Sequence, residues 1–134
     1  IHIQPIKDRI GQDLHNKLLV RLNLKGLPES PLYVLNVTVK ESSSNLGVKK
    51  SAVVTRGNLK VTANFTLSQT SYMASGIKPS SLITSTITAI SSYDIPQAQY
   101  VALANIKDAR ARAVKEIADD MRTRLGLYFR QKLQ

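Results

Sequence analysis

The sequence predicts an α+β domain built as a two-layer sandwich, with two helices on one face of a four-stranded, mostly antiparallel sheet, in the order β-α-β-β-β-α. Segments in the middle of the chain alternate apolar and polar residues, as strands with one covered face do. Two other segments repeat apolar residues at the three- and four-residue spacing of helices. The 134 residues suit one domain, so we expect 1–134 to fold as a unit.

A short strand and a helix are predicted at the start of the chain. The opening IHIQPI (1–6) alternates until Pro5, which ends the strand because proline cannot donate a hydrogen bond to a neighbouring strand. The helix then begins at Lys7, with Asp8 as the expected cap and Gly26 as the expected stop. Its apolar stripe consists of Ile10, Leu14, Leu18, Leu19 and Leu22.

Two further strands are predicted after this helix. The first alternates over 33–40, and the polar ESSSNLG (41–47) is expected to be the connection that follows it. The second covers 52–68 and has the clearest alternation in the chain. It is long enough for Gly57 to mark a bulge or a bend.

The last strand and the last helix complete the predicted order. The strand LITSTITAISSY (82–93) follows a loop at 71–81, and its blurred alternation predicts partial cover on both faces or a partner. The segment DIPQ (94–97) has the acidic residue, proline and glutamine of a helix start. The helix is expected to reach about Arg130, and its stripe consists of Ile106, Ala109, Ala113, Ile117, Met121, Leu125 and Tyr128.

The order of these elements predicts the topology. Three consecutive strands form an antiparallel meander, and the first strand adds in parallel through a right-handed crossover. Because each helix has a single apolar stripe, the helices cover only one face of the sheet. The opposite face is then rich in Thr, Asn, Ser and Lys, which water tolerates.

The charge of the chain indicates which partners to expect. Nineteen Lys and Arg against nine Asp and Glu give a net charge of +10, which favours polyanions such as nucleic acid, anionic lipid or an acidic protein surface. A basic nucleic-acid-binding domain is therefore one alternative. The outward positions of the best strand are Asn, Lys, Thr and Ser rather than aromatic residues that stack on bases, so a nucleic-acid partner is not expected.

Signatures of catalysis or of metal binding are missing from the sequence. The chain has no Cys, and no zinc-binding spacing, nucleophile elbow or phosphate-binding loop occurs. His2 and His15 have no partner in a motif, and we expect His15 to be solvated. Asp119 and Asp120 diverge by about 100° on a helix, so they do not converge on a metal. We expect neither an enzyme nor a cofactor. No run of 18 apolar residues occurs either, so a membrane-spanning helix is not expected.

Basic residues are the remaining candidates for a binding site. One group surrounds the connection between the first two strands of the meander and consists of Lys40, Lys49, Lys50, Arg56 and Lys60. A second group decorates the last helix and consists of Lys107, Arg110, Arg112, Arg122, Arg124, Arg130 and Lys132. For each single residue the alternative is a solvated position on the surface. Both a phosphate-only mode of nucleic-acid binding and binding to the phosphate-rich lipid A region of lipopolysaccharide stay open at this point.

Three segments resemble the LptE family. The segment RIGQDLHNKLLVRL (9–22) resembles its first helix, and the segment from Tyr33 to Leu67 resembles its paired strands, including RGNL before the longest one. The closing YVALANIKDARARAVKEIADDMRTRLGLYF (100–129) resembles its final helix in a divergent branch. The order and spacing of these pieces cover nearly the whole chain.

The resemblance implies an outer-membrane lipoprotein on the periplasmic side of the Gram-negative cell envelope. Members of the family plug the β-barrel protein LptD, assist its assembly and bind lipopolysaccharide, so an LptD-type barrel and lipopolysaccharide are the expected partners. The family's lipid-bearing N-terminal Cys is missing here, and we expect this anchor upstream of Ile1. The candidate lipopolysaccharide-binding residues are Lys49, Lys50, Arg56 and Lys60.

Overall fold

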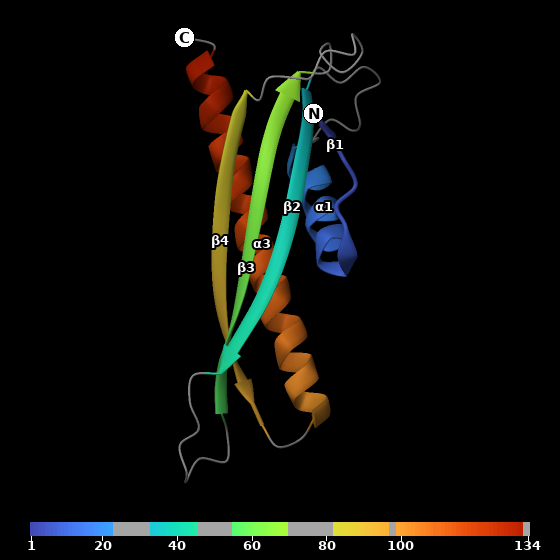
Figure 1. Ribbon diagram of the computed structural model, residues 1–134, viewed down its shortest axis with the longest axis vertical. Coiled ribbons are helices and arrows are strands. Elements are labelled where there is room, and N and C mark those ends of the chain that lie inside the picture. Colours follow the sequence, from blue (N-terminus) through green and yellow to red (C-terminus); the bar gives the residue numbers. More distant parts are fainter. Residues whose placement is uncertain (23–32, 46–54, 70–81, 97–98, 133–134) are drawn as a thin grey trace.

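The computed structural model has the predicted β-α-β-β-β-α order and is an α+β fold (Figure 1). It describes residues 1–22, 33–45, 55–69, 82–96 and 99–132. The elements are β1 (His2–Ile3), α1 (Asp8–Leu22), β2 (Tyr33–Asn45), β3 (Thr55–Gln69), β4 (Ile83–Ile95) and α3 (Gln99–Lys132).

The four strands form one mixed sheet in the order β1-β2-β3-β4. β1 pairs in parallel with β2 through His2↔Val34 and Ile3↔Leu35, whereas β2, β3 and β4 pair antiparallel in sequence order. This arrangement confirms the predicted meander and the parallel first strand. β1 is short because Pro5, two residues after its end, has no N–H with which to extend the ladder.

Both helices lie on the same side of the sheet, with the long α3 along β3 and β4 and the shorter α1 beside it (Figure 1). One hydrophobic core joins α1, α3 and the inward side chains of the strands. Its largest fully buried side chains are Leu14, Leu18, Leu35, Leu59, Val61, Phe65, Leu67, Ile87, Val114, Ile117, Met121 and Leu125. Burying each of these side chains stabilises the fold by about 1.5–3 kcal/mol relative to exposure, so the one-sided helix layer is the main source of stability.

Two strand boundaries differ from the prediction. The serine-rich residues 41–45, expected in a connection, continue β2 and pair with β3 from Glu41↔Val61 to Asn45↔Gly57. Asp94 and Ile95, expected to start a helix, are the last residues of β4, and α3 begins at Gln99. In both places hydrogen bonding to β3 overrides a local sequence signal that favours a turn or a cap.

Gly57 does not mark a bulge. The pairing passes through it without interruption, to Asn45 on one side and to Tyr93 on the other. A Cβ atom at Gly57 would lie 2.9 Å from Cζ of Tyr93, so the glycine makes room for this buried ring. The expected loop at 71–81, the start of the second meander strand at 52–54 and the stop at Gly26 lie outside the described residues.

β4 alternates more cleanly than its sequence suggests. Ile87, Ala89 and Tyr93 are buried against the helices, whereas Thr88 and Ile90 point to the other side and are exposed. Ile90 is 60% exposed, so within the described part of the chain only one face of β4 is covered. Of the two expected explanations, cover on both faces is not found there, and a partner on the exposed face stays a prediction.

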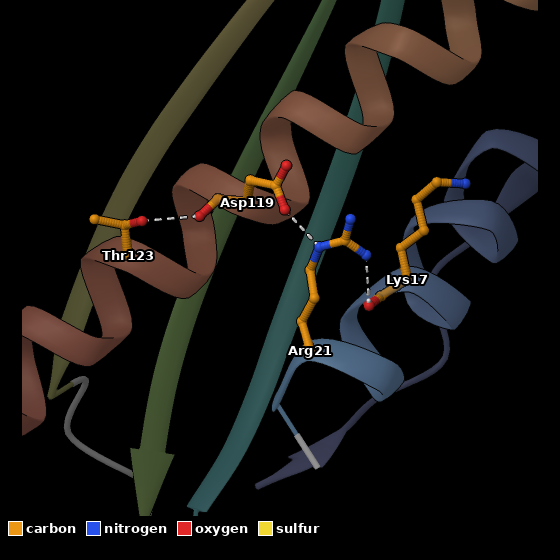
Figure 2. Close-up of polar contacts among 4 residues, drawn as sticks. All are labelled: Lys17, Arg21, Asp119 and Thr123. Carbon is orange, nitrogen blue, oxygen red and sulfur yellow. Dashed lines mark hydrogen bonds and ion pairs between the residues drawn. The ribbon is translucent and has the colours of Figure 1, made fainter. Parts of the chain in front are cut away.

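An ion pair links the two helices (Figure 2). The Nε atom of Arg21 in α1 donates to Oδ1 of Asp119 in α3 at 2.6 Å, and the same guanidinium donates to the carbonyl oxygen of Lys17. Thr123 donates to the carbonyl oxygen of Asp119. Asp120 instead faces Arg124 at 3.4 Å, so the two neighbouring acids do diverge as predicted, although Asp119 connects the helices rather than only meeting water.

Candidate polyanion-binding site

The face of the sheet opposite the helices carries hydroxyl and amide side chains in regular rows. The rows follow from the antiparallel register, which places Asn36, Thr66 and Thr84 side by side across the three long strands. The next row consists of Thr38, Asn64 and Thr86, and the row after it of Lys40, Thr62 and Thr88. We call this surface the open face.

Hydrogen bonds between neighbouring strands hold several of these side chains in place. Thr86 donates to Oδ1 of Asn64 at 2.5 Å, and Ser92 donates to Oδ1 of Asn58 at 2.7 Å. Because each amide uses its oxygen in these bonds, the NH₂ groups of Asn58 and Asn64 remain available as donors on the surface. The open face therefore presents oriented amide donors that suit sugar hydroxyls and phosphate oxygens.

Two lysines add positive charge to the open face. Lys60 on β3 is paired across the ladder with Ser42, and Lys40 on β2 is paired with Thr62, so the two lysines are diagonal neighbours. Diagonal neighbours in an antiparallel pair are separated by about 7–8 Å between backbone positions, within reach of one phosphate group for long side chains. Both are exposed, and neither forms an ion pair with any described residue.

Of the four predicted site residues, the structure places two on this face. Lys60 lies in its middle, whereas Arg56 lies toward the start of β3 and is partly neutralised by Asp94, with 3.8 Å between Nε and Oδ1. Lys49 and Lys50 lie outside the described residues. Lys40, which was not among the four, joins Lys60. Its outward position follows from alternation in the sequence, but its closeness to Lys60 depends on the register between β2 and β3.

Three arginines of α3 form structural contacts. Arg110 pairs with Glu41 of β2 at 2.8 Å, and Arg112 pairs with Asp108 at 3.0 Å within the helix. Arg124 donates to Oγ of Ser85. These side chains lie on the helix layer, away from the open face. The α3 cations that pair with no acid among the described side chains are Lys107, Lys115, Arg122 and Arg130.

Groups that bind metal ions are not brought together in the described segments. There, no three His, Asp or Glu side chains are placed to share a metal ion. His15 is half-buried rather than solvated as predicted, and its Nε2 lies 3.2 Å from the carbonyl oxygen of Ile3. No helix within the described ranges combines the length and the hydropathy needed to cross a membrane.

Solved structures share this fold at low sequence identity. The rare lipoprotein B from Shewanella oneidensis matches with a TM-score of 0.72 and 11% identity over 100% of both chains. A protein from Caulobacter crescentus CB15 described as a lipoprotein matches with a TM-score of 0.70 and 19% identity over 95% of this chain and 88% of that chain. A minor lipoprotein from Acinetobacter baumannii matches with a TM-score of 0.65 and 16% identity, over 91% of this chain and 86% of that one.

The family of the chain is shown by its sequence. No curated protein matches the chain directly. The family model described as LptE, lipopolysaccharide-assembly, matches residues 1–125 and therefore covers both helices and all four strands, up to the last turns of α3. The chain, which packs two helices over one face of a β1-β2-β3-β4 sheet, therefore belongs to the LptE family of lipopolysaccharide assembly.

Proposed function

We propose that this protein is a non-catalytic subunit of lipopolysaccharide transport that binds lipopolysaccharide on its open face and plugs an LptD-type outer-membrane barrel. The observation that carries the proposal is the pair Lys40 and Lys60 on the face of the sheet opposite the helices. Both are exposed cations without an ion pair to a described residue, and they lie among hydrogen-bonded Thr and Asn side chains. Membership of the LptE family supports the choice of lipopolysaccharide over other polyanions.

The chemistry of the open face fits the phosphates of lipid A. Lysine binds phosphate as a compact point charge, and the neighbouring hydroxyl and amide donors supply hydrogen bonds of fixed direction. Arg56 borders the same face and keeps several donors that Asp94 does not use. Lys49 and Lys50 follow β2 closely in the sequence, and we retain them as further candidates.

The same polarity supports the role of a plug. The lumen of an outer-membrane barrel is wet and polar, so a domain that exposes Thr, Asn and Lys fits inside it without burying bare apolar strands. An N-terminal lipid anchor would hold the domain at the periplasmic side of the outer membrane. A nucleic-acid partner is disfavoured because the outward side chains of the described strands include no Phe, Tyr or Trp on which bases stack.

Lipopolysaccharide binding is tested by comparing two double variants that lose the same charge. Lys40→Gln with Lys60→Gln removes both cations of the open face, whereas Lys107→Gln with Lys115→Gln removes two exposed lysines of α3 that pair with no described acid. Losing charge-assisted hydrogen bonds weakens binding by about tenfold or more, so we expect at least that loss for the first variant only. Equal weakening of both variants would show that net charge alone attracts lipopolysaccharide, and the assigned site would be rejected.

The plug role needs a separate measurement. The tagged protein is expressed together with an LptD-type barrel, and the barrel is quantified after purification through the tag in detergent. We expect stoichiometric recovery of the barrel with the wild-type chain and with the Lys107→Gln, Lys115→Gln control. Recovery at the level of an unrelated tagged protein would refute the plug role and leave lipopolysaccharide binding unaffected.

A further inference from the structure

The two edges of the sheet are treated differently by the fold. Along the outer edge of β4, side chains of α3 donate hydrogen bonds to backbone carbonyl oxygens. Asn105 donates to the carbonyl oxygen of Asp94 at 2.9 Å, Arg112 to that of Ser92 at 3.1 Å, and Arg124 to that of Thr86 at 3.0 Å. These carbonyl groups alternate with those that bond to β3, so they point away from the sheet. An incoming strand would find this edge already occupied at three positions.

The outer edge of β2 is open by contrast. The backbone N–H of Gln4 donates to the carbonyl oxygen of Leu35 at 3.0 Å, so Leu35 points its backbone groups toward β1. The N–H and C=O groups of successive residues point to alternate edges of a strand, so those of every second residue after Leu35 point to the same outer edge. These residues are Val37, Val39, Glu41 and Ser43. Within the described ranges no hydrogen bond reaches their outward backbone groups, because β1 stops at Ile3 and Pro5 follows.

This edge lacks most of the devices with which proteins protect a free strand. Proteins blunt edges with proline, with bulges, with very short strands or with unpaired charges. β2 (Tyr33–Asn45) contains no proline, pairs with β3 in an unbroken register and is 13 residues long. Its one acidic side chain, Glu41, is turned toward α3 and neutralised by Arg110 at 2.8 Å. As far as the described residues show, outward N–H and C=O groups thus remain available for another strand.

Positive charge borders the open edge. A groove of about 650 Å³ runs between the start of α1, the middle of β2 and α3, and its charged lining consists of Asp8, Arg9, Lys40, Glu41 and Arg110. Arg110 and Glu41 neutralise each other, while Asp8, Arg9 and Lys40 are exposed and form no ion pair with a described residue, so two unpaired cations face one unpaired acid. The surroundings therefore favour an acidic segment. A second copy of this chain is disfavoured, because each copy carries a net charge of +10.

We infer that the outer edge of β2, from Val37 to Ser43, is a docking surface for an extended, acidic polypeptide segment that adds to the sheet as a further strand. Main-chain hydrogen bonds to alternate residues of β2 supply the affinity, and Arg9 and Lys40 select for acidic side chains at the groove. This surface is the strand edge rather than the open face. It shares Lys40 with the proposed lipopolysaccharide site, but the main-chain hydrogen bonds of the edge are tested without lipopolysaccharide.

Amide hydrogen exchange tests the inference directly. The probe is a short synthetic peptide of alternating Thr and Val with Glu at both ends, and the control peptide has the same sequence with alternate amides N-methylated. In the free protein we expect fast exchange at Val37, Val39, Glu41 and Ser43, because their N–H groups meet water. The first peptide is expected to slow these amides at least tenfold and the N-methylated peptide to leave them unchanged. Equal effects of both peptides, or none, would overturn the inference.

A pair of proline variants locates the binding edge. Val39→Pro removes an outward N–H of β2 that the ladder with β3 does not use, and Thr88→Pro removes the corresponding outward N–H of β4. We expect Val39→Pro to weaken peptide binding at least tenfold and Thr88→Pro to bind as the wild type does, with circular dichroism confirming that both fold. Protection of the β2 edge that rises with protein concentration, without peptide, would identify a second copy as the occupant and overturn the acidic-segment assignment.

Discussion

Gly11 in α1 offers a sharp test of how closely the start of the chain is packed. A Cβ atom at this position would lie 2.6 Å from Cγ2 of Ile6, 2.9 Å from its carbonyl carbon and 3.0 Å from its carbonyl oxygen. Two of these atoms belong to the backbone, so no change of side-chain rotamer relieves the contact. Ile6 is itself only 5% exposed, which leaves the connection between β1 and α1 little room to move.

The expected effect of Gly11→Ala follows from two opposing contributions. Replacing glycine by alanine inside a helix stabilises the fold by about 0.5–1 kcal/mol, whereas an extra carbon in a well-packed core costs about 1–3 kcal/mol. The second contribution is the larger one, so we expect Gly11→Ala to lower the free energy of unfolding. Gly126→Ala is the matched control, because Gly126 lies in α3 and its added Cβ would meet nothing within 4 Å.

The comparison of these two variants isolates the packing contribution. Gly126→Ala is expected to raise the free energy of unfolding by about 0.5–1 kcal/mol. Since the helix contribution is common to both, the difference between them should be about 1–3 kcal/mol. Urea unfolding followed by far-ultraviolet circular dichroism measures both values, and this signal suits a chain without Trp. Equal stabilisation by both substitutions would refute the close contact between α1 and Ile6.

Three further substitutions test the core, the sheet and the helix pair. Phe65→Ala removes the largest fully buried side chain and should lower the free energy of unfolding by about 3–5 kcal/mol in the same urea assay. Gly57→Ala should cost about 1 kcal/mol and change the near-ultraviolet signal of Tyr93, because the new Cβ would lie 2.9 Å from that ring. A double-mutant cycle between Arg21 and Asp119 should give a coupling of about 0.5–1 kcal/mol that falls as salt is added, because the pair is partly exposed.

Each of these predictions has a result that would contradict it. Thr66→Ala, next to Phe65 on the outward side of β3, should change stability by no more than about 0.5 kcal/mol, and a loss as large as that of Phe65→Ala would contradict the assigned faces of the strand. An unchanged tyrosine signal in Gly57→Ala would contradict the contact with the ring. A coupling of zero between Arg21 and Asp119 would show that the contact in Figure 2 does not persist in solution.

The faces of the elements are predictable from the sequence because they depend on periodicity alone. The alternation of β3 predicts Phe65 inside and Lys60 outside, and both positions are confirmed. The apolar spacing of the helices likewise predicts Leu14, Leu18 and Ile117 as core residues. These assignments need only the direction of each side chain, which the backbone geometry of a helix or a strand fixes locally.

Features that depend on pairing between distant segments are not predictable in this way. The serines at 42–44 and the proline after Ile95 are local signals for a turn and a helix start, and only the hydrogen bonds with β3 keep these segments extended. Lys40 and Lys60 are close because of the register between β2 and β3. A shift of this register by one residue would abolish their closeness. The contacts of α3 with the edge of β4 likewise join residues far apart in the sequence.

The packing of α1 against α3 has a consequence for how the protein is made. Arg21 and Asp119 are separated by 98 positions in the sequence, and Leu14 and Leu18 share their core with residues of α3. During synthesis the apolar side of the first helix therefore emerges long before the surface that will cover it exists. Exposed apolar stripes of this kind attract chaperones and promote aggregation, so we expect the newly made chain to need protection until its final helix has been completed.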